Sequence, residues 1–337
     1  MSKNVLITGG AGFVAHHVVD YLLTNTDWNI ISLDRLDFSG NLNRLHDLVK
    51  DNPNKNRVRV VFQDLKAEIN PHTQRLIGDV DVILHLAAGS HVDRSIDNPM
   101  EFVMDNVIGT CNILNFARTQ KLEKFIYFST DEVFGPAPHG LDYDEYDRYN
   151  STNPYSASKA GGEELAVAFR NTYKIPVIVT HTMNVFGERQ HPEKYIPMCI
   201  KKIRDGQTIT VHSDPSKTIP GSRHYIHARD VADALLFLLN KDISETNVNG
   251  VKCPKFNIVG KQEINNLELA QLIADSQGKE LKYELTDFHS SRPGHDLRYS
   301  LSGKRMKDLG WEPQIALTDR IKQVVDWTLQ RPDWLMR

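Results

Sequence analysis

Val5-Leu-Ile-Thr-Gly-Gly-Ala-Gly-Phe-Val-Ala15 joins a short apolar run to apolar residues that recur at helical spacing. Gly9 and Gly12 allow the backbone to turn sharply and to approach a pyrophosphate, whose charge meets the N–H groups at the start of the next helix. A glycine motif between a strand and a helix is typical of dinucleotide-binding sites. The stretch therefore predicts a strand, a phosphate-binding turn and a helix that opens with Phe13 and Val14.

Outward from this turn, short apolar runs alternate with longer amphipathic stretches through the first half of the chain. Continuous apolar runs are typical of parallel strands that helices cover on both faces. The expected strands are residues 5–7, 29–33, 57–62, 80–86, 124–129 and 177–182, with helices around 102–120 and 158–173. The sequence therefore predicts an α/β fold, a Rossmann-like doubly wound parallel sheet.

The alternation of strands and helices stops after residue 183. The stretch that follows contains several prolines, and we expect it to be rich in loops. A helix at 231–239, a strand at 255–259 and a helix at 266–276, which Gly278 ends, restore the pattern.

This break divides the chain. We expect residues 1–182 to form the dinucleotide-binding domain, completed by about 225–260, and residues 183–224 and 261–337 to form a smaller mixed α/β lobe. The lobe is expected to close over the carboxyl edge of the sheet, where ligands bind in such folds.

Composition excludes several classes of protein. The 337 residues carry 40 basic and 43 acidic side chains, whereas a nucleic-acid-binding protein usually has a basic surplus. The longest apolar run, Ala234 to Leu239, is too short to cross a bilayer, and the opening residues lack a signal peptide. The three cysteines form no metal or disulfide pattern. We expect a cytoplasmic protein without metal, membrane or nucleic-acid partners.

Polar and small residues follow the expected strands at the cofactor edge. Asp34 lies about 20 residues after Gly12, where a carboxylate accepts hydrogen bonds from the ribose hydroxyls and repels a 2′-phosphate. This favours NAD over NADP, although the adjacent Arg35 could tolerate the phosphate. The next two strands end at further candidates, namely Asp64 and Leu65 near the adenine and Ala87 and Ser90 where a cofactor can lie close.

Tyr155 and Lys159 are four residues apart, hence on one face of a helix. A phenol has a pKa of about 10 and is a poor base, but a neighbouring ammonium favours the phenolate. Such a tyrosine can deprotonate a hydroxyl while a nicotinamide takes hydride from the same carbon. The alternative is an exposed helix start after Asn153 and Pro154.

Thr130, Asp131 and Glu132 follow the fifth expected strand. The threonine can hydrogen-bond a reacting oxygen, and crowding two carboxyl groups raises the pKa of one of them. One carboxyl group can then act as an acid and the other as a base, which hydride transfer alone does not require. The trio therefore indicates a dehydration; the alternative is an Asp-Glu pair that caps a helix.

These motifs together resemble the extended short-chain dehydrogenase/reductases and, within them, the nucleotide-sugar 4,6-dehydratases of the dTDP-glucose type. The resemblance covers nearly the whole chain. It rests on TGGAGFVA at 8–15, LDRLDFSGN at 33–41, AAGSHVDRS at 87–95, TDEVFG at 130–135, YSASK at 155–159, NVFGERQHPEKYIP at 184–197, SRHYIHARD at 222–230 and SRPGHDLRY at 291–299.

The resemblance implies a mechanism with NAD as a tightly bound cofactor. Tyr155, tuned by Lys159, removes the proton of the 4-hydroxyl while hydride leaves C4 of the hexose, and Thr130 holds that oxygen. Glu132 abstracts the proton on C5, and Asp131 protonates the departing 6-hydroxyl. Hydride then returns to C6, which gives a 4-keto-6-deoxy sugar and regenerates NAD.

The resemblance also implies two sets of binding residues. The cofactor would contact Gly9, Gly12, Phe13, Val14, Asp34, Asp64, Leu65, Ala87, Ser90, Asn106, Tyr155 and Lys159. The sugar nucleotide would contact Ser90, Asn184, Lys194, Arg223, Arg292, His295 and Tyr299. A homodimer is implied as well, in which helices 102–120 and 158–173 of each subunit form a four-helix bundle; their apolar residues would equally well serve an internal core.

Departures from the family pattern affect binding more than chemistry. Ala15 replaces a third glycine, Phe134 replaces a tyrosine, and Gly89 replaces the usual glutamate, which puts sugar selection in doubt. The acidic segment 136–151 is expected to be a solvated loop rather than a lid.

Other readings stay open. Thymine and uracil differ by one methyl group, so a UDP-glucose 4,6-dehydratase is an alternative. Related epimerases lack the acid–base pair, and related decarboxylases place serine at Asp131. A non-catalytic nucleotide sensor would be expected to lack Tyr155 or Lys159.

Overall fold

The computed structural model describes residues 2–37, 39–243, 253–287 and 298–336. The chain forms two compact units, each assembled from several segments. The first unit is Met1–Val133, Ser151–Thr182 and Ala232–Phe256, and the second is Phe134–Asn150, Met183–Val231 and Asn257–Arg337. Segment 134–150, which we expected in the first domain, thus lies in the second unit, as do residues 225–231.

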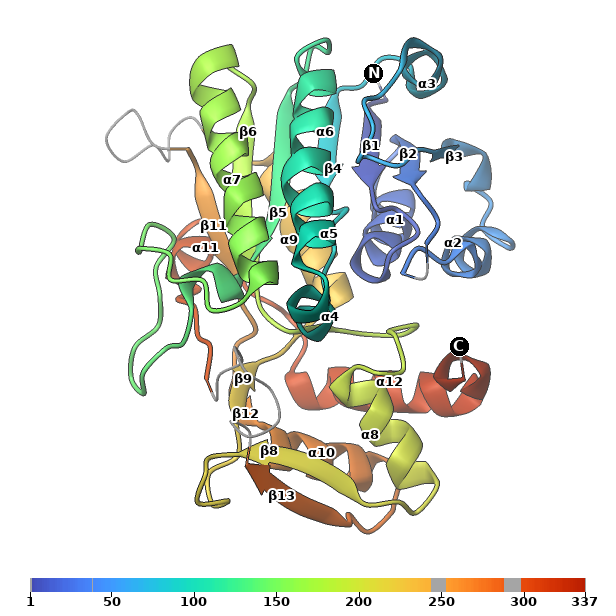
Figure 1. The fold of residues 1–337 in the computed structure, drawn as a ribbon. Helices are drawn as coiled ribbons and strands as arrows, with labels where there is room; N and C mark the ends of the chain where they lie inside the picture. The colour runs from blue at the N-terminus through green and yellow to red at the C-terminus, as the bar shows by residue number, and fades with distance from the viewer. Residues whose placement is uncertain (1, 38, 244–252, 288–297, 337) are drawn as a thin grey trace. The chain divides into compact units, whose positions relative to one another are not determined.

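Seven strands form the sheet of the first unit within the described residues (Figure 1). Their order is β11-β6-β5-β4-β1-β2-β3, and the pairs from β6 to β3 are parallel. The strands are β1 (Asn4–Thr8), β2 (Asn29–Asp34), β3 (Val58–Phe62), β4 (Val82–His85), β5 (Lys124–Thr130), β6 (Val177–Thr182) and β11 (Lys255–Ile258). The order reverses between β1 and β4, which confirms the doubly wound fold and marks the edge where ligands bind in such sheets.

Helices cover both faces of this sheet (Figure 1). The helical segments are α1 (Phe13–Asn25), α2 (Leu42–Val49), η1 (Lys55–Arg57), α3 (Pro71–Ile77), α4 (Val92–Asp97), α5 (Pro99–Val103), η2 (Met104–Ile108), α6 (Gly109–Ala117), η3 (Asp131–Phe134), α7 (Pro154–Tyr173) and α9 (Ala228–Asn240). Neighbouring helices α6 and α7 pack on one face, and α1 and α9 lie on the other, where the Tyr21 hydroxyl donates to Asp233 at 2.6 Å. Apolar residues of β1, β2, β4 and β6 are therefore buried on both sides, as their continuous runs predict, whereas Val60 and Phe62 of the edge strand β3 are exposed.

The expected single helix over 102–120 is wrong in detail. The chain forms α5, then a π-helix (η2), then α6. Gly162 of α7 faces this π-turn, because a Cβ at Gly162 would lie 2.3 Å from the Asn106 carbonyl oxygen and 2.6 Å from the Tyr127 hydroxyl. The missing side chain lets the two helices approach closely at the point where the π-turn widens the backbone.

The second unit has its own core. Helices α8 (Tyr195–Arg204), α10 (Asn266–Ser276) and α12 (Leu317–Gln330) pack together around buried residues such as Ile200, Ile273 and Val325. Its remaining elements are β7 (Val185–Phe186), β8 (Ile209–Ser213), β9 (Ser222–His224), β10 (Ile226–His227), β12 (Glu263–Asn265), β13 (Tyr283–Asp287), α11 (Lys304–Asp308) and η5 (Pro332–Leu335). The stretch after residue 183 is thus more regular than its prolines indicate, since Pro197 lies in the first turn of α8, where a proline is tolerated.

None of the helices in the described ranges is long and apolar enough to span a membrane.

Candidate active site

The backbone of the glycine turn lies very close to the residues that follow β4 and to β2. Gly9 has φ +69°, and a Cβ there would lie 2.9 Å from the Cα of Ala87 at the end of β4. A Cβ at Gly10 would lie 2.1 Å from the Ser32 hydroxyl oxygen of β2, so this glycine, which the sequence analysis did not single out, is needed for the same reason. Gly12 precedes α1 without a side-chain cap. The turn therefore presents backbone to a ligand at a helix N-terminus, which fits a pyrophosphate.

Asp34 ends β2 beside this turn and is buried. Its carboxylate accepts hydrogen bonds from the Ala11 amide at 3.0 Å and the Leu36 amide at 2.8 Å. Burial raises the pKa of Asp34, and these two hydrogen bonds oppose the rise. Arg44, which sequence reasoning missed, donates to the carbonyls of Ala11 and Ser39 at 3.2 and 2.6 Å and so links the two loops.

The other expected cofactor residues lie around the same edge in different environments. Phe13 and Val14 open α1 and are half-buried, Asp64 is partly exposed, and Ser90 is exposed. Leu65 instead lies in the hydrophobic core of the first unit. The Ala87 amide donates to the Thr8 hydroxyl at 3.1 Å, which fixes the end of β4 against the end of β1.

A buried histidine connects this turn to the π-helix. His85 Nδ1 lies 2.7 Å from the Thr8 hydroxyl, and His85 Nε2 lies 3.0 Å from the Thr110 hydroxyl, which donates to the Asn106 carbonyl. Burial, and then the charge of Lys159, lower the pKa of His85 to about 3, so the ring is neutral. A buried histidine in an otherwise apolar strand needs such polar partners. The position of His85 inside the apolar run 80–86 is therefore the sequence signal that would have identified it.

Both the oxygen and the nitrogen of the Asn106 side-chain amide hold other residues in place, namely Gly89 and Ser158. Its oxygen accepts from the Gly89 amide at 2.8 Å, and its nitrogen donates to the Gly89 carbonyl at 3.0 Å and to the Ser158 hydroxyl at 2.8 Å. Ser158 in turn donates to the Tyr155 carbonyl at 2.7 Å. Asn106 therefore ties the loop after β4 to the first turn of α7.

Tyr155 lies at the start of α7 and is only 9% exposed, so the alternative of an exposed helix start is wrong. Its ring packs against Val92 and contacts Phe102 edge-on at 6.4 Å, and its amide donates to the Ser95 hydroxyl at 3.1 Å. Burial first, and then the negative charge of Glu132, raise the pKa of Tyr155, whereas a hydrogen bond with the Thr130 hydroxyl lowers it.

Lys159 lies one helical turn after Tyr155 on α7 and is buried as well. The ammonium Nζ donates to the Phe128 carbonyl at 2.7 Å and lies 4.5 Å from the centre of the Tyr127 ring. Burial lowers the pKa of Lys159 to about 7, although the charge of Glu163 opposes the shift. Helical spacing places the two residues on one face, and the tuning of Tyr155 by Lys159 stays a prediction.

Thr130, Asp131 and Glu132 lie where β5 runs into η3, within hydrogen-bonding reach of Tyr155 through Thr130. The Thr130 hydroxyl donates to the Asp131 carboxylate at 2.9 Å and accepts from the Glu132 amide at 3.3 Å. Asn153 donates to the Glu132 carboxylate at 2.9 Å. A phenol, a hydroxyl and two carboxyl groups thus converge, which is a set able to move protons to and from a sugar.

Asn153 is a further positioning residue that sequence reasoning missed. Its side-chain oxygen caps α7 by accepting from the Ser156 amide at 2.8 Å, while its nitrogen holds Glu132. We expect Asn153→Ala to lower the free energy of unfolding by about 1 kcal/mol because the cap is lost. Asn153→Ser, which keeps a capping oxygen, should stay close to wild type in urea unfolding but lose the contact to Glu132. Equal stability of the alanine variant and the wild type would contradict the capping role.

Of the expected sugar-nucleotide residues that the structure describes, all but Ser90 belong to the second unit. The Arg223 guanidinium lies 4.7 Å from the centre of the buried Tyr299 ring and donates to the Ser222 carbonyl at 2.7 Å. Lys194 precedes α8, and the Asn184 carbonyl accepts from the Ile226 amide at 3.3 Å. Arg292 and His295 lie outside the described residues.

The departures from the family pattern have local explanations. Ala15 is buried in α1, and Phe134 is fully buried, stacked on Tyr143 at 5.6 Å. A Cβ at Gly89 would lie 3.1 Å from the Phe102 ring and 3.2 Å from the Asp105 carboxylate.

The acidic segment is a loop, as expected, but it is anchored rather than simply solvated. The Glu145 carboxylate is buried and accepts from the Asn257 amide at 3.0 Å. The Asp142 carboxylate accepts from Arg298 at 3.0 Å and from the Ser300 hydroxyl at 2.6 Å.

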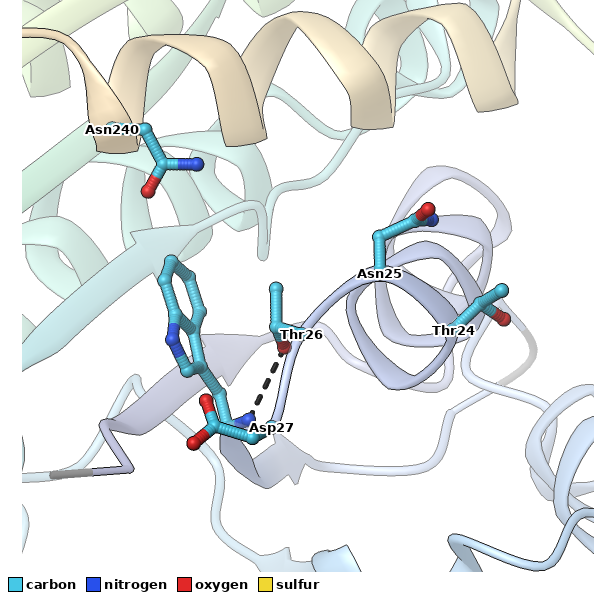
Figure 2. Close-up of a pocket in the computed structure, with 6 residues that line it drawn as sticks. Thr24, Asn25, Thr26, Asp27 and Asn240 are labelled. Atoms are coloured by element: carbon cyan, nitrogen blue, oxygen red, sulfur yellow. Dashed lines mark hydrogen bonds between the residues drawn. The ribbon is translucent and has the colours of Figure 1, made fainter.

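A separate hollow of about 560 Å³ lies at the opposite edge of the sheet from the glycine turn. It is lined by Thr24, Asn25, Thr26, Asp27, Trp28 and Asn240 (Figure 2). These residues end α1, precede β2 and end α9, and the Trp28 amide donates to the Thr26 hydroxyl at 3.2 Å. The hollow therefore lies outside the candidate site.

Comparison with known proteins identifies the family. A family model described as GDP-mannose 4,6 dehydratase matches residues 6–324. A low-salt glycan biosynthesis protein of Haloferax volcanii is 37% identical over 327 residues, which cover 97% of this chain and 98% of that protein. The trifunctional UDP-glucose 4,6-dehydratase/UDP-4-keto-6-deoxy-D-glucose 3,5-epimerase/UDP-4-keto-L-rhamnose-reductase of Arabidopsis thaliana is 35% identical over 336 residues, or 98% of this chain and 48% of that protein.

A solved structure agrees with these relatives. The dTDP-glucose 4,6-dehydratase DesIV of Streptomyces venezuelae, with NAD bound, has a TM-score of 0.83 at 33% identity, and the match covers 98% of each chain. The resemblance that the motifs carry is thereby confirmed, and so is the fold. The chain belongs to the GDP-mannose 4,6 dehydratase family.

Proposed function

We propose that this chain is an NAD-dependent dTDP-glucose 4,6-dehydratase, a hydro-lyase that yields the 4-keto-6-deoxy sugar. The observation that carries the proposal is the convergence of Thr130, Asp131, Glu132 and Tyr155 at the carboxyl end of β5. The glycine turn and Asp34 at the neighbouring strand ends fit a dinucleotide. The similarity to DesIV over nearly the full length supports the choice of reaction and substrate.

The residues divide the proton transfers among them. NAD, when bound, supplies the hydride acceptor and later the hydride donor. Tyr155 takes the proton of the 4-hydroxyl, with Thr130 holding that oxygen, and Glu132 takes the proton on C5. Asp131 gives its proton to the departing 6-hydroxyl.

These roles are coupled through charge. The negative charges of Glu132 and Asp131 both raise the pKa of Tyr155. An Asp131 that carries the proton it must deliver no longer repels the phenolate, so the acid form of Asp131 favours the base form of Tyr155. The proton needed for elimination thus also prepares the tyrosine for the oxidation that precedes it.

The test incubates the purified protein with dTDP-glucose and, separately, with UDP-glucose. We expect mass spectrometry to detect loss of one water from dTDP-glucose, without net reduction of added NAD. Oxidation without loss of water, or inversion at C4, would contradict the proposal and favour an oxidoreductase or an epimerase.

UDP-glucose is the second candidate substrate. The observation that favours it is the similarity of this chain to the trifunctional Arabidopsis protein, whose name includes a UDP-glucose 4,6-dehydratase. Loss of water from UDP-glucose alone would select this alternative, because the two substrates differ in the nucleoside and not in the reacting hexose.

The second unit is proposed to bind the sugar nucleotide, and the first to bind NAD. The planar guanidinium of an arginine can donate two hydrogen bonds to diphosphate oxygens, which supports Arg223 and Arg292 for that role. The further proposed contacts are Asn184, Lys194, His295 and Tyr299. The packing of Arg223 on Tyr299 limits the positions available to its guanidinium, in keeping with such a role.

We further propose a cytoplasmic homodimer. Several apolar residues of the two helices that would form the bundle, namely Ile113, Leu114, Phe116 and Ala166, are core residues of the first unit. The dimer proposal is instead supported by exposed Met100, Val103 and Ile108, which precede α6, and by Tyr173 on α7. The three free cysteines are in keeping with a reducing compartment. Light scattering after size-exclusion chromatography tests the dimer.

A further inference from the structure

Arg35 directly follows Asp34, the carboxylate that we assign to the ribose. An arginine near that position is the residue type that accommodates the 2′-phosphate of NADP. In this structure the guanidinium has other partners. Nη1 and Nη2 donate to the two carboxylate oxygens of Asp105 at 2.5 and 2.9 Å, and Nε donates to Asp37 at 2.7 Å. All three guanidinium nitrogens therefore face carboxylate oxygens.

The pair with Asp105 is the stronger of the two contacts. It is bidentate, a geometry in which both hydrogen bonds are charge-assisted, and the Asp105 side chain is only 8% exposed. Burial opposes the charge on Arg35, but the hydrogen bonds and charges of Asp105, and then of Asp37, together raise the pKa of the guanidinium. The cation is thus held in a partly desolvated ion pair that bulk salt screens weakly.

Gly89 accommodates this ion pair. A Cβ at Gly89 would lie 3.2 Å from the Asp105 carboxylate, and Asn106, the neighbour of Asp105, holds both the amide and the carbonyl of Gly89. The glutamate usual in the family would bring a second carboxylate against Asp105. The structure therefore relates the glycine to the Arg35–Asp105 pair, whereas the sequence pattern had put sugar selection in doubt.

The charges around Asp34 reinforce the effect. Lys66 Nζ lies 3.4 Å from Asp105 and 3.6 Å from Glu101, so this second cation is also engaged by carboxylates. The cluster combines two cations, Arg35 and Lys66, with five carboxylates, from Asp34, Asp37, Asp64, Glu101 and Asp105. A phosphate monoester carries a charge of about −1.5 to −2 at neutral pH, so this surplus of negative charge opposes it.

We propose that Asp105 is a specificity-determining residue, which makes the site select NAD over NADP by engaging the Arg35 guanidinium that would otherwise pair with a 2′-phosphate. The inference rests on the proposed function, because it requires a dinucleotide at the glycine turn. It assigns the selection of NAD over NADP to Asp34 and Asp105 together. Asp34 alone would leave the adjacent Arg35 available to the 2′-phosphate.

The test measures the dissociation constants of NADH and NADPH by fluorescence titration of the full-length protein, after removal of co-purified nucleotide. We expect Asp105→Asn to tighten NADPH binding at least about tenfold, the scale of one charge-assisted phosphate contact, and to change NADH binding by less than about threefold. Adding Arg35→Ala to this variant should abolish the gain. Asp105→Ser provides a second neutral replacement if the asparagine variant folds poorly.

Glu101→Gln is the matched control, because it removes the same charge near Lys66 without touching Arg35. An equal gain in the control would assign the effect to net charge and overturn the proposal. Wild-type binding of NADPH as tight as that of NADH would also overturn it, as would unchanged ratios in both Asp105 variants. A wild-type protein that binds neither dinucleotide would overturn the proposed function as well, so the two failures are distinguishable.

Discussion

Glu132→Gln is expected to oxidise the substrate at C4 and yet to eliminate water at least about a hundredfold more slowly than the wild-type protein. A positioned general base contributes about 10² to 10⁴ to a rate, and glutamine keeps the size of the side chain but cannot take the C5 proton. Its amide oxygen can still accept the hydrogen bond from Asn153 that holds Glu132 at 2.9 Å. The loss should therefore be chemical and not structural.

The two steps are separated by observing them independently. Reduced nicotinamide should accumulate in a single turnover of Glu132→Gln, because hydride has left C4 and no C6 acceptor has formed. Exchange of the C5 hydrogen with deuterated solvent should fall in parallel with elimination. Asp144→Asn, which removes an exposed carboxylate from the loop that follows η3 in the sequence, serves as the control and should retain both steps. Equal loss of oxidation and elimination in Glu132→Gln would contradict the division of roles between Tyr155 and Glu132.

The convergence of Thr130, Asp131 and Glu132 with Tyr155 could be predicted because it follows from local patterns. A parallel strand delivers the residues after it to the carboxyl edge of the sheet, so a run that ends at Thr130 places the trio there. Helical spacing likewise places Tyr155 and Lys159 on one face. The fold was predictable for the same reason, since continuous apolar runs alternate with helices.

The partners of these residues could not be predicted, because they are tertiary contacts. Nothing local indicates that the Lys159 ammonium donates to the Phe128 carbonyl, or that Asn153 divides its amide between the α7 cap and Glu132. Both contacts depend on how α7 packs on β5. The spacing of Tyr155 and Lys159 therefore predicts their shared helix face but not the carbonyl that the ammonium contacts.

The sequence did not predict the π-helix, for a different reason. The π-turn is a single turn within a longer helical segment, and no residue type in 104–108 distinguishes it from the α-helical turns on either side. Its cause lies in another helix, where Gly162 admits the Asn106 carbonyl. The same turn carries Asp105, so the sequence did not predict the contact between Asp105 and Arg35 either.

Tyr155→Phe is expected to lower the rate of hydride transfer at least about a thousandfold while the protein stays folded. The buried ring packs against Val92 and Phe102, and phenylalanine preserves that packing. The hydroxyl is the group that contacts Thr130 and that must take the proton of the 4-hydroxyl, so its removal deletes the base for oxidation. Both oxidation and elimination should fail, because elimination needs the ketone; reduced nicotinamide should not accumulate, in contrast to Glu132→Gln.

Tyr127→Phe provides the matched comparison for this variant. Tyr127 is a second buried tyrosine, and its hydroxyl donates to the Lys159 carbonyl at 2.9 Å. Removing that hydroxyl should lower the free energy of unfolding by about 1 kcal/mol, the net value of one buried hydrogen bond, and leave hydride transfer within about threefold of wild type. The contrast matters because each variant deletes one phenolic oxygen from a buried tyrosine of the first unit. If single-turnover oxidation survived in Tyr155→Phe, the base would have to be another group within reach of the 4-hydroxyl, and Thr130 hydrogen-bonded to Asp131 would be the arrangement to test next.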